Sequence, residues 1–131
     1  MALDIRVRTG KTVLLESELH VALNNDGYYW FLHPLFERLR DQCGKYVDLY
    51  GDALFTRDDY PRLRSLLDEA AALAKGKPAT WSIHVGTQLK PTRKELYAAV
   101  SREQLLTLIE AIRNMVEMAD RLDGQLECVG D

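Results

Sequence analysis

The segment from Asn24 to Phe55 constrains the fold most strongly, because a helical pattern, a turn and a strand pattern follow one another within it. It holds all three phenylalanines and one of the two tryptophans. Apolar residues recur between Tyr28 and Leu39 at spacings of three and four, which is typical of an amphipathic helix. Pro34 leaves two alternatives: the helix begins near His33, or it bends at the proline.

Gly44 ends this helical pattern, and residues 45–50 then alternate between apolar and polar side chains. Such alternation predicts a half-buried strand with Val47 and Leu49 on one face. The other face would carry Tyr46, Asp48 and Tyr50.

The rest of the chain contains further strand and helix patterns. Period-two alternation predicts strands at residues 3–8, 12–15, 80–85 and 95–100, and a short last strand at 126–129 is an option. Helical periodicity predicts helices at 56–75 and 101–123. Residues 16–23 fit either a strand or a short helix.

Two of the predicted helices begin with capping residues. Thr56 precedes one helix, and Asp59 stands three residues later as the acidic partner of a capping box. Ser101 and Gln104 form the same pattern before the last helix. The element order is therefore ββαβαββα with an optional last strand. It predicts one α+β domain over residues 1–131, in which about three helices pack on one face of a mixed or mostly antiparallel sheet.

Composition narrows the class of protein. The 131 residues include 17 basic and 20 acidic side chains, and a net charge of −3 argues against a nucleic-acid partner. The first residues have no apolar region of the kind a signal peptide needs, and no stretch is apolar enough to predict a membrane span. Cys43 and Cys128 have no metal-ligand spacing, so we expect free thiols in a cytoplasmic protein.

The sequence lacks the motifs that identify common enzyme classes, including the glycine-rich nucleotide loops and the nucleophile elbow. Its three histidines are His20, His33 and His84, which lie on separate predicted elements at uninformative spacings. We therefore predict no metal and no cofactor, and we favour a protein that is not an enzyme.

One candidate binding surface lies on the helix predicted around Pro34. If Leu32 is at the centre of the apolar stripe, Trp30, Glu37 and Asp41 fall on the opposite side. An exposed tryptophan beside two carboxylates would suit a protein partner. The alternative is that Trp30 folds into the core from a loop before the helix.

A second candidate site is a small-ligand cleft. Tyr46 and Tyr50 flank Asp48 on the predicted strand, and His84 and Gln88 stand near a strand end beside a loop. Two phenols beside a carboxylate can hold a polar ligand, and a histidine at a loop can act as a general base. An ordinary half-buried sheet face would give the same pattern.

Basic residues cluster at one place only, at Lys90, Arg93 and Lys94. This cluster could meet an acidic partner or a phosphate, and a solvated loop has the same composition.

In size, acidity and lack of catalytic motifs the chain resembles the toxin-neutralising immunity proteins of bacteria. The resemblance implies a protein that binds a protein partner, such as a basic toxin domain. A small-molecule-binding domain or modest enzyme is one alternative. A homodimeric structural domain is another, in which the last helix pairs with itself through Met115 and Met118.

Overall fold

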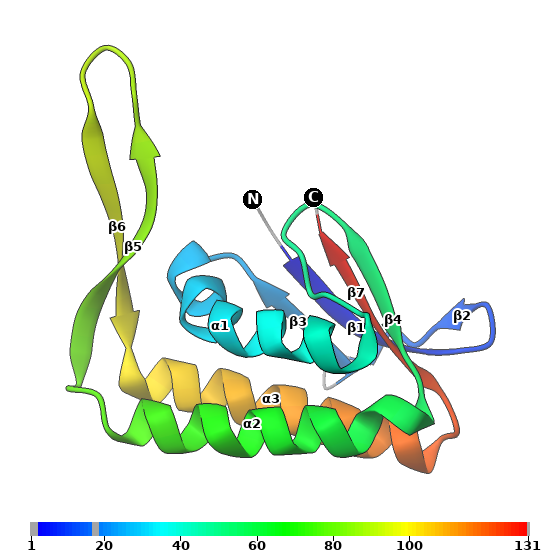
Figure 1. Ribbon diagram of the computed structural model, residues 1–131. Helices are drawn as coiled ribbons and strands as arrows, with labels where there is room; N and C mark the ends of the chain where they lie inside the picture. Colours follow the sequence, from blue (N-terminus) through cyan, green and yellow to red (C-terminus); the bar gives the residue numbers. More distant parts are fainter. Residues whose placement is uncertain (1–2, 17–18, 131) are drawn as a thin grey trace.

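The computed structural model describes residues 3–16 and 19–130, which form three α-helices and seven β-strands (Figure 1). The helices are α1 (Asp26–Cys43), α2 (Tyr60–Lys75) and α3 (Arg102–Arg121), and the 3-10 turn η2 (Arg57–Asp59) leads into α2. The strands are β1 (Leu3–Thr9), β2 (Thr12–Val13), β3 (His20–Leu23), β4 (Asp52–Phe55), β5 (Thr80–Gln88), β6 (Lys94–Ser101) and β7 (Gln125–Gly130). The predicted α+β class is confirmed.

The main sheet is antiparallel throughout, and β1 is at its centre. Strands β2 and β3 pair with β1 along one edge, β7 pairs along the other, and β4 pairs with β7. The optional last strand is thus β7, an interior strand between β1 and β4. The ambiguous segment 16–23 ends in β3, and residues 17 and 18 lie outside the part of the chain that the structure describes.

The sheet has one apolar face and one polar face, as the alternation in β1 predicts. On the buried face lie Leu3, Ile5, Val7, Leu23, Phe55, Leu126 and Cys128. Helices α1 and α3 contact the sheet, and α2 packs on both of them. On the other face, Glu127 accepts hydrogen bonds from Arg6 at 2.6 Å and from Arg8 at 2.8 Å across the β1–β7 pair.

Helix α1 begins eight residues before Pro34, so the alternative in which it begins near His33 is wrong. Asn25 caps it by accepting a hydrogen bond from the Gly27 amide at 2.8 Å. Pro34 lies inside the helix with its side chain exposed, and it supplies no amide for the Trp30 carbonyl. Gly44 ends the helix in the left-handed conformation, with φ of 77°.

The predicted strand at residues 45–50 is wrong. Val47 and Leu49 do point into the core, each 2% exposed, but the segment forms no sheet ladder. The position beside β7 is occupied by β4, and the Val47 carbonyl accepts a hydrogen bond from the Tyr29 hydroxyl at 2.8 Å. The alternation therefore indicates only which side chains are buried, because every second side chain of an extended segment can point into the core without strand pairing.

The two predicted caps are both present, in different forms. Thr56 donates its amide to the Asp59 carboxylate at 2.9 Å, which completes the predicted box at η2. Ser101 accepts from the Gln104 amide at 3.3 Å, as predicted for α3. The Gln104 side chain, however, accepts from the Tyr28 hydroxyl at 2.6 Å, so it links α3 to α1.

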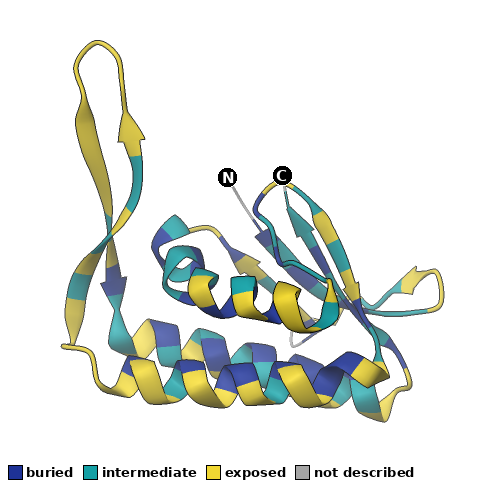
Figure 2. Ribbon diagram, in the orientation of Figure 1, coloured by how far each residue is buried: buried dark blue, intermediate teal, exposed yellow. Residues whose placement is uncertain are grey.

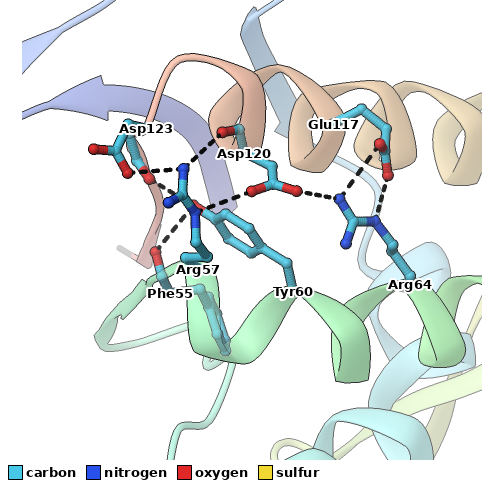
Figure 3. Close-up of polar contacts among 8 residues, drawn as sticks. Phe55, Arg57, Tyr60, Arg64, Glu117, Asp120 and Asp123 are labelled. Atoms are coloured by element: carbon cyan, nitrogen blue, oxygen red, sulfur yellow. Dashed lines mark hydrogen bonds and ion pairs between the residues drawn. The ribbon is translucent and has the colours of Figure 1, made fainter.

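A polar network joins the start of α2 to the end of α3 (Figure 3). Arg57 pairs with Asp120 at 3.3 Å and Asp123 at 3.0 Å, and Arg64 pairs with Asp120 at 2.6 Å and also with Glu117. Tyr60 lies beneath these ions and donates to the Gly124 carbonyl at 2.8 Å. Burial, with Asp120 and Asp59 nearby, raises the pKa of Tyr60 to about 12, so it stays a donor.

Cys43, Cys128, Met115 and Met118 lie in the core or against it. Cys43 and Cys128 are unpaired, and burial raises the pKa of the Cys128 thiol to about 12. Met115 is fully buried, so it is not available to a second copy of α3, and Met118 is partly buried. None of the helices in the described residues is long and apolar enough to cross a membrane.

Removing the cap of α3 should weaken the fold. We expect Ser101→Ala to lower the free energy of unfolding by about 1 kcal/mol, because the Gln104 amide loses its acceptor. Ser65→Ala is the matched control, since Ser65 is exposed inside α2, where alanine is the better helix former. Chemical denaturation measures both. Equal effects of the two substitutions would contradict the cap.

The Glu127 ion pairs should make stability depend on pH. Burial acts to raise the pKa of the Glu127 carboxyl group, but Arg6 and Arg8 outweigh it and hold the pKa below its ordinary value. The folded-state pKa is lowered, so this contribution is present above the unfolded pKa of about 4.3 and is lost as the pH falls through the folded value.

Glu127→Gln should therefore destabilise the protein at pH 7, and the difference from the unsubstituted protein should shrink in acid. Glu110→Gln is the control, because Glu110 is 63% exposed and, among the described residues, pairs only with Arg113 at 3.6 Å. Urea denaturation across the acid range measures the difference. A difference that stays constant with pH would rule out the ionic contribution.

Candidate functional site

Strands β5 and β6 form a separate two-stranded hairpin that projects from the body of the protein (Figure 1). We call residues 80–101 the arm. Figure 2 shows that its outer half is exposed almost throughout, in contrast to the sheet and helices. In the sequence, apolar and polar residues alternate along both strands, and this pattern does not indicate that the rest of the protein covers only the base of the arm.

The base of the arm is fixed to α1 and α3. Trp81 meets Phe31 edge-on with ring centroids 5.9 Å apart, and Val100 is 1% exposed. A Cβ atom on Gly27 would lie 2.8 Å from a Val100 methyl group, so α1 approaches β6 closely because residue 27 has no side chain. Asn25 also donates to the Ala99 carbonyl at 3.2 Å.

One face of the outer arm carries a polar and aromatic row. His84 lies against Tyr97, with ring centroids 5.4 Å apart, and its Nε2 is 2.6 Å from Glu95. Thr87 donates to the same carboxylate at 3.0 Å. The Thr87 hydroxyl, followed by His84 and Arg93, holds the pKa of Glu95 below its ordinary value. These contacts order the arm between its base and its tip.

The tip of the arm, residues 88–95, is apolar and basic. Leu89 is 72% exposed, and the Gln88 side chain donates to the Lys90 carbonyl at 2.6 Å, which shapes the turn. Arg93 pairs with Glu95 at 3.3 Å. Lys90 and Lys94 have no ion-pair partner within residues 3–16 and 19–130.

Both edges of the arm are open. In the described part of the chain, β5 pairs only with β6 and β6 only with β5. A two-stranded ribbon is marginally stable by itself in water, and unpaired strand edges recruit further strands. The arm therefore offers backbone donors and acceptors together with exposed Leu89, Leu96 and Tyr97.

The predicted surface on α1 is only partly open. Trp30 is half-buried, with its ring centroid 5.3 Å from that of Tyr29 and 4.7 Å from that of His33. Glu37 pairs with His33 at 3.1 Å and with Arg40 at 3.9 Å, whereas Asp41 is exposed. Trp30 thus lies at the edge of the core, between the two predicted positions.

His33 completes a hydrogen-bonded chain that the sequence analysis missed. Its Nδ1 faces Glu37, and its Nε2 is 2.8 Å from the hydroxyl of Tyr46, which lies 3.3 Å from that of Tyr29. A carboxylate, an imidazole and a phenol in this order could pass a proton from Tyr46 to His33. The His33–Glu37 spacing of four residues on one helix was the available signal. In the structure this series of hydrogen bonds connects residues 45–50 to α1.

Tyr46 and Asp48 line a shallow hollow of about 370 Å³ with Lys45, Asp52 and Leu54. Tyr50 stands beside it, 65% exposed, and donates its amide to Asp48 at 3.1 Å. His84 and Gln88 lie on the arm, at the other side of the molecule from β4 (Figure 1). The structure therefore brings together Tyr46, Asp48 and Tyr50, and it places His84 and Gln88 elsewhere.

In the described residues, no group of three or more histidine, cysteine or acidic side chains is placed to hold a metal ion. Comparisons with protein-family models, with curated proteins and with solved structures each find no match to this chain.

Proposed function

We propose that this protein is a protein-binding domain that docks through the arm. The observation that carries the proposal is a two-stranded ribbon that is fixed at its base and uncovered at its outer half (Figure 2). Ordering such a ribbon costs conformational entropy that its own contacts offset poorly. A partner that covers the ribbon would supply the missing burial.

The chemistry of the arm suits a protein partner. Its open edges can add a strand from the partner through backbone hydrogen bonds, and exposed Leu96 and Tyr97 can fill pockets beside that strand. Tyrosine is enriched at the energetic centres of interfaces. No catalytic group is needed for this role, and the Glu37–His33–Tyr46 chain then serves to hold the fold.

The α1 surface supports a second mode of the same function. Exposed Asp41 and half-buried Trp30 would face a basic partner such as a toxin domain. Glu37 contributes less than the sequence suggests, because its carboxylate already contacts His33 and Arg40. We therefore rank this surface below the arm.

A cross-linking experiment tests the role of the arm. A photoreactive residue in place of Leu89 should give one adduct of defined mass when the protein is irradiated in its source cells. The same residue in place of Leu73 is the control, because Leu73 is 51% exposed on α2, outside the arm. Equal labelling at both positions, or none at either, would refute docking through the arm.

Trp30→Ala separates the two surfaces. Since Trp30 is half-buried, we expect it to lower the free energy of unfolding by roughly 2 kcal/mol, less than the truncation of a fully buried tryptophan. The Leu89 adduct should form in undiminished yield at a temperature where the variant is folded. If the adduct is lost while the circular dichroism spectrum is unchanged, α1 is the docking surface.

A further inference from the structure

We propose that the partner of the arm is a second copy of this chain, and that two copies exchange arms so that each tip enters the hollow beside β4 of the other. This inference rests on the proposed function, because it names the partner of the same arm. It differs from pairing through α3, whose Met115 is buried.

Charge complementarity favours a second copy. The tip carries three basic residues and one acidic residue, a net charge of +2, within a chain of net charge −3. The remainder of the chain therefore carries a net charge of −5, and a basic tip is attracted to it. Within one molecule the tip projects away from that remainder (Figure 1).

The hollow beside β4 is complementary to the tip in charge and polarity. Asp48 and Asp52 supply negative charge, and Lys45 in the same wall is already paired with Asp59. Tyr46 and Leu54, the latter 40% exposed, are among the lining residues and offer apolar surface to Leu89. Lys90 follows Leu89 directly and Lys94 lies four residues further on, so the apolar side chain and the two cations of the tip would meet the apolar surface and the two carboxylates of the hollow.

The size of the contact favours a reciprocal pair. The tip has eight residues, fewer than the roughly 20–30 residues that each side of a stable interface contributes. A two-fold arrangement makes each contact twice, and the second contact then forms within one complex at high effective concentration. The nine residues of β5 extend about 30 Å at ~3.3 Å per residue, enough to reach across a neighbouring small domain.

A nucleic-acid partner fits the tip less well. Arg93 is neutralised by Glu95, so two lysines remain to meet phosphates, and the net negative charge of the chain opposes a polyanion. The experiment must therefore distinguish binding of DNA from the exchange of arms between two copies.

Charge reversal tests the exchange. Sedimentation equilibrium should show a dimer for the unsubstituted protein. The tip variant Lys90→Glu/Lys94→Glu and the hollow variant Asp48→Lys/Asp52→Lys should each raise the dissociation constant at least about tenfold. Because the four substituted residues are at the surface, circular dichroism should show both variants folded. Asp52→Lys alone is the fallback if loss of the Asp48 hydrogen bond to Tyr50 disturbs the fold.

Mixing the two variants is the decisive step. The reversed tip of one variant matches the reversed hollow of the other, and the unsubstituted tip matches the unsubstituted hollow, so the mixture should form a heterodimer. Glu103→Lys/Glu110→Lys, on the exposed side of α3, is the control that should leave the dissociation constant of the dimer unchanged.

Four results would overturn the inference: a monomer at every concentration, a dimer indifferent to both reversals, a mass that grows without limit, or no heterodimer on mixing. Duplex DNA that binds the unsubstituted monomer but not the tip variant would also overturn it, in favour of nucleic acid. A Leu89 adduct with a different protein would support docking through the arm, and it would contradict only the inference that the partner is a second copy of this chain. Absence of any Leu89 adduct would refute both the docking through the arm and the exchange of arms between two copies.

Discussion

The pairing of β7 between β1 and β4 is the constraint on which the rest of the structure depends. Ile5 lies opposite Cys128, and Ala53 lies opposite Cys128 from the other side, so segments from the start, middle and end of the chain share one apolar surface. Backbone closeness enforces this arrangement. A Cβ on Gly130 would lie 2.4 Å from the Asp48 carbonyl oxygen, and one on Gly124 would lie 2.6 Å from that of Arg8. Helices α1 and α3 pack on this sheet.

The sequence predicted most of the body, because burial there follows the period of each element. Leu3, Ile5 and Val7 alternate and are buried, and the stripe of α3 faces the core as its spacing requires. The same reasoning failed at residues 45–50. Val47 and Leu49 follow the pattern of a strand, yet β4 occupies the position beside β7. Which of two segments pairs with a sheet edge cannot be predicted from the local sequence pattern of either one.

The candidate sites were less predictable, since they depend on what lies beside each element. Trp30 was assigned to either surface or core, and it lies between them because Tyr29 and His33 flank it. His84 and Gln88 were grouped with Asp48 by chemistry alone, and the fold separates them. The arm was missed because alternation in β5 and β6 is the same whether a strand is covered or projects. The contacts of Trp81 with Phe31 and of Gly27 with Val100 show which part of the arm is covered.

The arm also divides the protein into regions of different local stability. Its base is fixed by Trp81 and Val100, whereas beyond Ile83 few buried contacts hold it. The amides of the outer hairpin can therefore exchange with solvent through local fraying, without unfolding the sheet or the helices. If the arm docks a partner as proposed, substitutions at the tip would alter recognition while the folding equilibrium of the body is little affected. Specificity of such a protein can diverge in evolution at positions that selection for folding hardly restrains.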